Sequence, residues 1–160
     1  MLQILELSVI EIKQETPTVK SIKLEKNNLD YKPGQYMMMQ FETGDGENTK
    51  PLSIASSPTE KFLLFSTKIS ESSFKKKYNE LKIGDKVKVK GPMGVFVLDE
   101  KAKNLIFLGG GIGITPFRDM IKYATDKKLK IKLNFLYSNR IDDEIWYKNE
   151  WDLWQKQNPN

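Results

Sequence analysis

Residues 105–117 read Leu-Ile-Phe-Leu-Gly-Gly-Gly-Ile-Gly-Ile-Thr-Pro-Phe. The apolar run at 105–108 predicts a strand buried on both faces, as in a parallel sheet. The glycines that follow allow the backbone to turn sharply and a ligand to approach closely, because no Cβ stands in the way. Thr115 is the expected N-cap of a helix, and Pro116 is its expected first residue. A strand, a glycine turn and a helix N-terminus in this order indicate a site for a phosphate or another electron-rich group.

The spacing of the glycines leaves a second interpretation open. The dinucleotide fingerprint is G-x-G-x-x-G, but its third glycine position holds Ile114 when counted from Gly109 and Pro116 when counted from Gly111. The stretch alone is therefore compatible with a nucleotide site or with a plain tight connection between a strand and a helix.

The composition narrows the possible chemistry. The chain has 160 residues, of which 39% are hydrophobic and 29% charged, as is ordinary for a soluble globular protein. It contains no cysteine and no histidine. This excludes a disulfide framework, a cysteine-ligated iron–sulfur cluster, a thiol nucleophile and any triad built on imidazole, and no metal site is expected. Catalysis by this chain would therefore rely on an organic cofactor.

The charge and the absence of targeting signals suggest partners and a location. The net charge of +5 permits an anionic ligand or an acidic protein partner, although most lysines are spread out as on a solvated surface. No apolar stretch approaches the length needed to cross a bilayer, and the N-terminus lacks a signal-peptide pattern. We therefore expect a cytoplasmic protein.

The first hundred residues predict an antiparallel β-barrel of the Greek-key type. Leu5, Leu7 and Val9 alternate along a first strand, and the apolar phase then flips, which indicates a bulge. Further strands are expected at 19–24, 35–41, 50–57, 62–68, 86–90 and 95–98, a polar loop at 42–49 and a short helix at 72–81. Strands this short and this closely spaced imply a closed antiparallel barrel.

From Asp99 the pattern changes to alternating strands and helices. A strand at 105–108, a helix at 116–127 and a strand at 131–137 predict a β-α-β unit with parallel strands. A second helix is expected to begin near Asp142. That helix is expected to have Asp143 and Glu144 in its first turn, to carry Trp146, Trp151 and Trp154 in core or interface roles, and to end before Pro159.

The chain therefore divides near residue 100, into a barrel domain at 1–99 and an α/β domain at 100–160. Two parallel strands and two helices leave a sheet edge and a helix face uncovered, and parallel sheets are normally larger. Either the chain is a fragment or a partner completes the second domain, and we favour the fragment.

Three further stretches carry groups suited to a nucleotide. Residues 50–58 form a strand with hydroxyls, or else an edge strand with Lys50 in solvent. Residues 66–75 place two serines at a helix start, where N–H groups and hydroxyls could receive a phosphate, with ordinary N-capping as the alternative. Residues 136–140 follow the second parallel strand, where open α/β sheets bind ligands. Arg140 there could pair with the 2′-phosphate of NADP, and no carboxylate is present to hold a ribose diol.

Taken in order, six motifs resemble those of the ferredoxin–NADP⁺ reductase superfamily. They are Pro33-Gly34-Gln35-Tyr36, Lys50-Pro51-Leu52-Ser53, Ser72-Ser73-Phe74-Lys75, Gly91-Pro92-Met93-Gly94-Val95-Phe96, Gly109 to Pro116, and Tyr137-Ser138-Asn139-Arg140. The resemblance covers essentially the whole chain. It implies an FAD-binding antiparallel barrel followed by an NAD(P)-binding α/β domain, which is the division already inferred from the strand and helix pattern.

The resemblance also implies roles for individual residues. Lys50 stands where the family has an arginine that holds the flavin pyrophosphate. Leu52 replaces the tyrosine that stacks on the isoalloxazine ring, and Ser53 matches the serine near the flavin N5, the one catalytic candidate. The other implied contacts are Thr67 and Lys68 for the ribityl and diphosphate parts, Ser72 or Ser73 for phosphate, Gly110, Gly111, Gly113 and Thr115 for nicotinamide and pyrophosphate, and Ser138 and Arg140 for the 2′-phosphate.

The sequence departs from the family pattern in three places. Lys50 lacks the bidentate fork of an arginine. Leu52 lacks an aromatic face, which contributes about 0.5–1.5 kcal/mol beyond buried area, so bound flavin is expected to exchange. The family's C-terminal portion, with its Cys-Gly strand end and terminal aromatic region, has no counterpart in the sequence. These departures bear on flavin retention and on turnover.

The leading hypothesis is an FAD-dependent oxidoreductase that takes hydride from NAD(P)H and passes electrons to an acidic carrier such as a ferredoxin or flavodoxin, or to an oxygenase component. The chain would act by positioning, with Ser53 near the flavin N5 and Thr115 orienting the carboxamide, so both must share one cleft. The alternative is a non-catalytic, partner-dependent flavin-binding subunit. A nucleic-acid-binding barrel is disfavoured, because the strands lack interleaved aromatic and basic residues.

Overall fold

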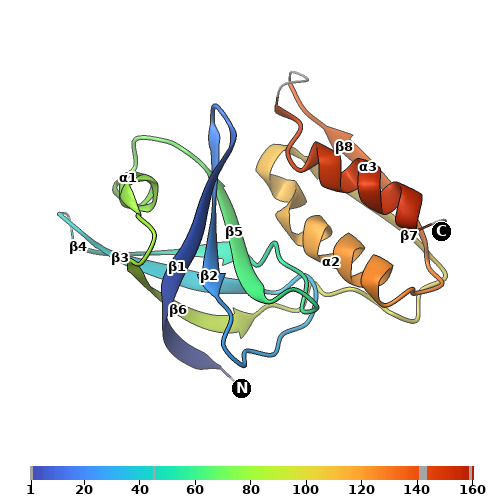
Figure 1. Cartoon of the computed structure of the whole chain (residues 1–160), viewed down its shortest axis with the longest axis horizontal. Coiled ribbons are helices and arrows are strands. Elements are labelled where there is room, and N and C mark those ends of the chain that lie inside the picture. Colours follow the sequence, from blue (N-terminus) through green and yellow to red (C-terminus); the bar gives the residue numbers. More distant parts are fainter. Residues whose placement is uncertain (1, 45, 141–143, 159) are drawn as a thin grey trace.

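The computed structural model describes residues 2–44, 46–140, 144–158 and 160. In this part of the chain two sheets lie side by side, each with its own helices (Figure 1). The larger sheet contains β1 (Gln3–Thr16), β2 (Val19–Glu25), β3 (Tyr36–Thr43), β4 (Gly46–Ser53), β5 (Phe62–Lys68) and β6 (Lys86–Met93). The smaller sheet contains β7 (Asn104–Gly110) and β8 (Lys132–Ser138). The helices are α1 (Ser73–Glu80), the 3₁₀ turn η1 (Gly111–Ile114), α2 (Thr115–Asp126) and α3 (Lys148–Gln157).

The larger sheet is antiparallel and curled, as the strand pattern predicts. Its order is β4-β3-β6-β1-β2-β5, so β6 lies between strands that precede it by a long way in sequence, as in a Greek key. The sheet is an open half-barrel and not the closed barrel that the strand spacing predicts, because no ladder joins its edge strands β4 and β5 within the described residues. A single backbone bond, Ala55 N–H to the Leu64 carbonyl at 2.8 Å, links the chain segments there.

Alternation along the strands builds the core of the half-barrel. Met37, Met39 and Phe41 all point inward, and the two methionines have no exposed surface. They pack with Leu7, Val87 and other inward residues in one apolar cluster. The expected bulge in β1 is confirmed by a shift of register between Val9 and Glu11 against β2.

Several predicted boundaries in this half are wrong. The polar loop at 42–49 is largely strand, because β3 and β4 pair continuously from Tyr36–Ser53 out to Thr43–Gly46. Gly46 has φ +106°, and the Thr43 hydroxyl donates to its carbonyl at 2.6 Å. β4 ends at Ser53 and not at 57, and β6 runs on to Met93, whereas 95–98 is not a strand. Backbone pairing, which the apolar pattern does not report, sets these limits.

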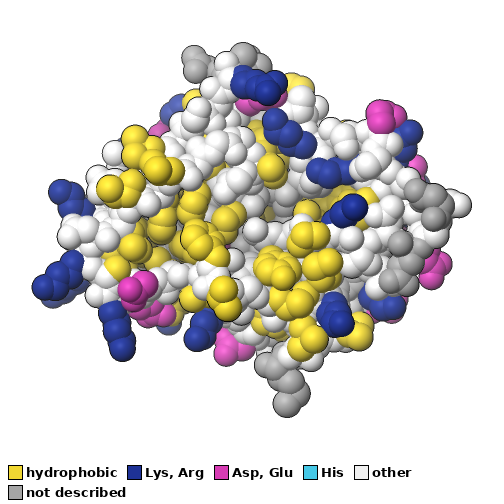
Figure 2. Space-filling view, turned by 180° about the vertical axis from the view of Figure 1, so that it is seen from behind, with side chains coloured by type: hydrophobic (Ala, Val, Ile, Leu, Met, Phe, Trp, Pro, Cys, Tyr) yellow, Lys and Arg dark blue, Asp and Glu magenta, His cyan; other side chains and the backbone are white. Residues whose placement is uncertain are grey.

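The smaller sheet has parallel strands, as expected, but only one covered face. Helices α2 and α3 lie on the same side of β7 and β8 (Figure 1). Phe107 is buried on that side, whereas Ile106, Leu108 and Leu136 are 65%, 71% and 58% exposed. The prediction that residues 105–108 are buried on both faces is therefore wrong for this chain. Figure 2 shows hydrophobic side chains gathered on the surface over this part of the molecule, on the left of the view.

The two helices of the smaller unit differ in how well the sequence predicts them. α2 turns an apolar stripe inward, with Phe117, Met120 and Ala124 buried, as predicted. α3 begins at Lys148, because Tyr147 takes a left-handed φ of 57° as its N-cap, so the prediction of Glu144 in its first turn is wrong. Trp146 therefore precedes the helix, and it is 1% exposed. The predicted start at 142 and 143 and the proline at 159 lie outside the described residues.

Two neighbouring residues of α2 anchor it to the half-barrel. Arg118, 2% exposed, donates to the Ala55 carbonyl at 2.7 Å and to Glu60 at 3.0 Å, and it binds Glu150 of α3 at 2.6 Å. Asp119 has no exposed surface and accepts the Gly34 N–H at 2.6 Å. The first residues of α2 are thereby fixed relative to the ends of β3 and β4. None of the helices in the described residues is long and apolar enough to span a membrane.

The Asp119 carboxyl predicts a pH dependence of stability. Burial raises its pKa from 3.8 to about 8, with Glu60 adding to the shift, while the Gly34 N–H, Arg118 and Lys26 oppose it. Between these two pKa values the folded chain keeps a proton that the unfolded chain releases. The free energy of unfolding should therefore fall as pH rises, by up to about 1.4 kcal/mol per pH unit from this group.

The test is urea unfolding from pH 5 to pH 8. Asp119→Asn keeps an oxygen that can accept the Gly34 N–H but cannot ionise, so its stability should vary less with pH than that of the parent. Asp152→Asn, at an exposed carboxylate of α3, is the control and should keep the parent's slope. Equal slopes for Asp119→Asn and the parent would contradict the prediction.

Candidate functional site

The carboxyl ends of the two parallel strands form one edge. Gly110 and Ser138 are paired in register at these ends. An open hollow of about 520 Å³ lies there. It is lined by Leu108, Gly109, Gly110, Leu136, Tyr137 and Ser138. The glycine turn and the 136–140 stretch are therefore brought together, at the edge where ligands of open α/β sheets bind.

The glycine turn is shaped differently from the prediction. A 3₁₀ turn separates β7 from α2, so Ile114 is the N-cap and Thr115 is the first residue of the helix. The Thr115 hydroxyl donates to the Ile112 carbonyl at 3.2 Å and does not cap the helix. The prediction of Thr115 as N-cap is wrong by one position, because the 3₁₀ turn uses the hydroxyl. Gly113 is exposed on this turn.

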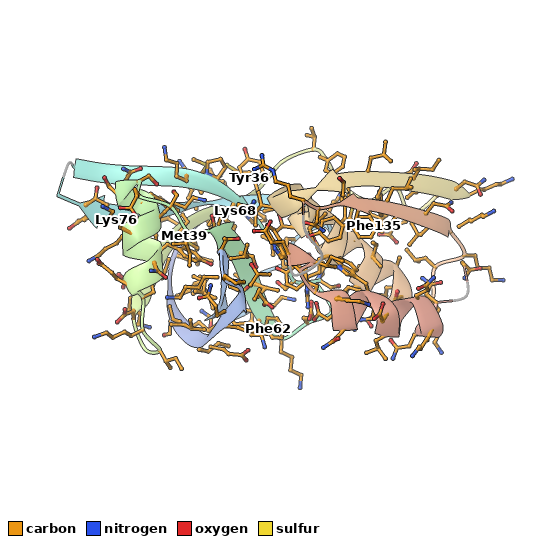
Figure 3. All side chains as sticks on the ribbon, turned by 90° about the horizontal axis from the view of Figure 1, so that it is seen from above. Tyr36, Met39, Phe62, Lys68, Lys76 and Phe135 are labelled. Carbon is orange, nitrogen blue, oxygen red and sulfur yellow. The ribbon has the colours of Figure 1, made fainter. Side chains whose placement is uncertain are left out.

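The half-barrel meets the glycine turn through the end of β5. Gly111 has φ +50°, and a Cβ built on it would lie 4.0 Å from the Lys68 Nζ. Figure 3 labels Lys68 in the middle of the molecule, between the strands of the half-barrel and the α/β unit. The Lys68 ammonium also lies 5.9 Å from the ring of Trp146, which precedes α3. Three segments far apart in sequence thus converge on Lys68.

The other edge of the half-barrel carries the Lys50–Ser53 stretch. Lys50 is exposed, and Leu52 is half-buried against the barrel core, paired with Met37. Ser53 is paired with Tyr36, so these two side chains share the opposite face of the hairpin. Leu52 and Ser53 therefore point to different sides of β4.

The end of β4 reaches the start of α2. Ala55, two residues beyond Ser53, packs in one cluster with Ile114 and Phe117, and its carbonyl accepts from Arg118. Ser53 and Thr115 thus lie at the two sides of one junction between the half-barrel and the α/β unit. Their roles toward a cofactor stay predictions.

Positive groups gather where β5 meets α1. Lys75 of α1 donates to the Thr67 hydroxyl at 2.5 Å and to the Lys68 carbonyl at 2.9 Å. Ser72 is the N-cap of α1, is exposed and makes no capping bond through its hydroxyl, and Ser73 is half-buried in the first turn. Among the described residues, neither Lys68 nor Lys75 has an ion-pair partner. Two cations and an exposed hydroxyl fit a phosphate or diphosphate group.

The residues predicted to bind the 2′-phosphate lie at the carboxyl edge of the parallel sheet, on the β8 side. Ser138 and Arg140 are exposed at and beyond the end of β8. Burial raises the pKa of the neighbouring Tyr137 phenol. Within the part of the chain that the structure describes, no group of three or more carboxylate, imidazole or thiol side chains could hold a metal ion.

The sequence analysis assigned no cofactor-binding role to three residues at this junction. Lys75 is one of three consecutive lysines of a short helix, and only the fold shows which of them turns back to β5. Tyr36 faces Ser53 through the register of the β3–β4 hairpin, and its ring lies 3.0 Å from where a Cβ on Gly94 would stand. The Trp146 indole is buried with its Nε1 unpartnered. The pairing register of the β3–β4 hairpin could have identified Tyr36 as the partner of Ser53, but only if the turn had been placed correctly after Thr43.

Two family models match the chain. The family model described as Oxidoreductase FAD-binding domain matches residues 7–98, more than half of the chain. The chain belongs to this family. A second model, described as Oxidoreductase NAD-binding domain, matches residues 107–160. Both matches agree with the FAD-binding and NAD(P)-binding domains that the resemblance implies.

The curated relatives of this FAD-binding family member are proteins of several different kinds. Sulfhydrogenase 2 subunit gamma of Pyrococcus furiosus is 31% identical over 152 residues, which are 89% of this chain and 51% of that protein. A flavohemoprotein of Candida albicans is 35% identical, over 84% of this chain and 36% of that protein. One component of the Na(+)-translocating NADH-quinone reductase of Haemophilus influenzae is 39% identical over half of this chain and 20% of that protein. The chain thus spans about half or less of the length of these relatives.

Solved structures share the fold of this family member. Ferredoxin-NADP+ reductase from Plasmodium falciparum with 2'P-AMP superposes with a TM-score of 0.88 at 22% identity, covering 98% of this chain and 68% of that one. A ferredoxin NADP+ reductase from Neisseria gonorrhoeae with bound FAD and NADP gives 0.85 at 17% identity, over 97% and 65%. The antiparallel half-barrel followed by a partial parallel sheet is therefore the fold of these reductases.

Proposed function

We propose that this chain is the flavin- and nicotinamide-binding part of an NAD(P)H-dependent flavoprotein reductase. The observation that carries the proposal is the position of the Lys68 ammonium beside Gly111. At this point the open edge of the half-barrel meets the glycine turn of the α/β unit. FAD, when bound, supplies a two-electron acceptor that returns electrons one or two at a time. The division into 1–99 for FAD and 100–160 for NAD(P)H is part of this proposal.

The side chains supply positioning and charge. Lys50 and the serine pair at the start of α1 would hold the flavin diphosphate, and Thr67 and Lys68 would contact its ribityl and diphosphate parts. Leu52 would give the flavin an apolar but non-aromatic neighbour, and Ser53 would donate or accept a hydrogen bond near the reacting edge. No side-chain acid or base is needed for hydride transfer itself.

The nicotinamide nucleotide would lie across the carboxyl edge of β7 and β8. Gly110, Gly111 and Gly113 expose backbone there, and Thr115 would orient the carboxamide. Ser138 and Arg140 are exposed at the far end of the same edge, where they would receive the adenosine 2′-phosphate. Among the described residues at this end of the edge, Arg140 is a cation and none is a carboxylate, which favours NADPH over NADH.

The acceptor and location belong to the proposal as well. A net charge of +5 favours an acidic carrier protein, such as a ferredoxin or flavodoxin, as the partner that takes the electrons. We place the reaction in the cytoplasm, where NAD(P)H is available to a chain of this kind.

The proposal is tested by mixing the purified chain with FAD and titrating it without oxygen with NADH or NADPH, following the flavin absorbance. Ser53→Ala should slow flavin reduction about tenfold, equivalent to about 1.4 kcal/mol of transition-state stabilisation, with FAD affinity nearly unchanged. Thr49→Ala, on the same strand and farther from the junction, should reduce flavin at the parent rate. A chain that binds no FAD and oxidises no NAD(P)H would overturn the proposed function.

A second candidate is a flavin-binding subunit that becomes active only with a partner. The observation that favours it is the exposed apolar face formed by Ile106, Leu108 and Leu136. In that case the same experiment gives bound FAD but no reduction by NAD(P)H until the second chain is added.

A further inference from the structure

We propose that Lys75, on α1, is a diphosphate-binding residue that works as a pair with Lys68. The inference rests on the proposed FAD site and adds to it a cation to which the family resemblance gives no role. Its ligand class is a diphosphate or another closely spaced pair of phosphate groups.

The first argument is where the Lys75 ammonium lies. The side chain leaves α1 and crosses to the end of β5, where Nζ donates to the Thr67 hydroxyl at 2.5 Å and to the Lys68 carbonyl at 2.9 Å. An ammonium has three protons, so one remains for a ligand. The neighbouring Lys76 and Lys77 behave differently: they extend into solvent and pair with Glu71 and Glu80.

The second argument is the balance of charge. Lys75 is half-buried, and both its burial and the charge of Lys68 lower the pKa of its ammonium. No carboxylate among the described residues lies within ion-pair distance of either lysine. The charge of Lys68 therefore acts on the Lys75 ammonium with no described carboxylate to balance it, and a bound anion would relieve both this repulsion and the loss of hydration.

The third argument is that Lys50, on the other edge strand of the half-barrel, β4, is a weaker phosphate ligand than the arginine it replaces. Lys50 stands where the family has an arginine, and a lysine offers a point charge without a bidentate fork. A second lysine restores two-point recognition of a diphosphate, one ammonium for each phosphate. The Lys68 ammonium lies beside Gly111, and the Lys75 ammonium lies one residue back along β5, beside Thr67.

The alternative is that Lys75 only ties α1 to β5 through its two hydrogen bonds. The structural role and the phosphate-binding role of Lys75 predict different effects on different ligands. A structural tie affects stability and every ligand alike, whereas a phosphate contact affects phosphate-bearing ligands and leaves riboflavin, which has no phosphate, unchanged. A conservative substitution also distinguishes the two roles, because Lys75→Arg keeps the charge that a phosphate contact needs.

The experiment measures three affinities on the full chain: FAD and riboflavin by flavin fluorescence, and inorganic pyrophosphate by calorimetry. Lys75→Gln should weaken FAD and pyrophosphate binding about tenfold or more, equivalent to at least about 1.4 kcal/mol. Riboflavin binding should stay within the error, and Lys75→Arg should recover most of the loss. Lys77→Gln, on the opposite side of α1, is the matched control and should bind all three ligands like the parent.

The outcomes distinguish this inference from the proposed function. Unchanged FAD and pyrophosphate affinity in Lys75→Gln overturns the inference and leaves the function standing. An equal loss for riboflavin, together with a lower urea midpoint, shows a structural tie and also overturns it. If the parent binds pyrophosphate through Lys75 but does not bind FAD, the inference stands and the proposed function fails. If the parent binds neither, both fail.

Discussion

Arg118→Met is expected to lower the free energy of unfolding by about 3–5 kcal/mol. The Arg118 side chain is 3% exposed and is held by Glu60, 13% exposed, and Glu150, 37% exposed. Removing the cation leaves the largely buried Glu60 carboxylate next to that of Glu150 with no counter-ion, and it leaves the Ala55 carbonyl without its donor. The melting temperature should fall by about 10 °C, since a chain of this size loses roughly 2–4 °C per kcal/mol.

Two companion variants show whether charge is the cause. Arg118→Lys keeps the charge but offers one ammonium in place of the fork, so it should lose less than Arg118→Met. Combining Arg118→Met with Glu60→Gln and Glu150→Gln removes the stranded negative charges and should recover part of the loss. A loss below about 1 kcal/mol for Arg118→Met, or no recovery in the triple variant, would contradict this account.

Gly34→Ala is expected to lower the free energy of unfolding by about 3 kcal/mol or more. A Cβ on Gly34 would lie 2.3 Å from the Met120 Cε and 2.3 Å from the backbone oxygen of Phe96. The methionine can move, but the carbonyl belongs to the main chain and cannot. The backbone at Gly34 also has φ +102°, which disfavours any residue with a Cβ.

Gly84 provides a matched control for the backbone contribution. It has φ +95°, and a Cβ there would meet nothing within 4 Å. Gly84→Ala should therefore show only the conformational penalty, about 1–2 kcal/mol. The difference between the two variants in urea unfolding measures the clash of the added Cβ with the Phe96 carbonyl and the Met120 side chain. Equal losses for the two variants would show that this contact is not tightly packed.

Local pattern predicted the elements whose partners lie nearby in sequence. The stripe on α2 and the bulge in β1 follow from the spacing of apolar residues. The parallel pairing of β7 and β8 follows from the intervening helix, because such a crossover returns the chain in the same direction. The Phe62–Lys68 strand was predicted to the residue, since polar turns bound it on both sides.

Features that depend on distant contacts were not predictable in this way. The start of α3 is set by Tyr147, whose hydroxyl bonds Ser66 of β5 at 2.5 Å. Nothing in the residues around Tyr147 reports that partner. The apolar run at 105–108 likewise says what prefers burial but not whether a second layer is there to bury it.

The candidate site was predicted in its parts but not in its assembly. The sequence pointed to the glycine turn and to the serines at the start of α1 as separate stretches. Lys68 lying beside Gly111 is a product of tertiary packing. The choice of Lys75 from three adjacent lysines needs the rotational setting of α1 against β5, which a short helix with a weak apolar face leaves undetermined.

The two anchors on α2 have a consequence for nucleotide recognition. Arg118 and Asp119 are consecutive, yet they reach the half-barrel through different segments, the chain after β4 and the turn before β3. A helix held at two such points cannot roll or slide, and the glycine turn is continuous with its first residue. The entropic penalty of aligning the two proposed nucleotide sites would therefore be met once, when the chain folds, and binding would need no closing motion of this helix.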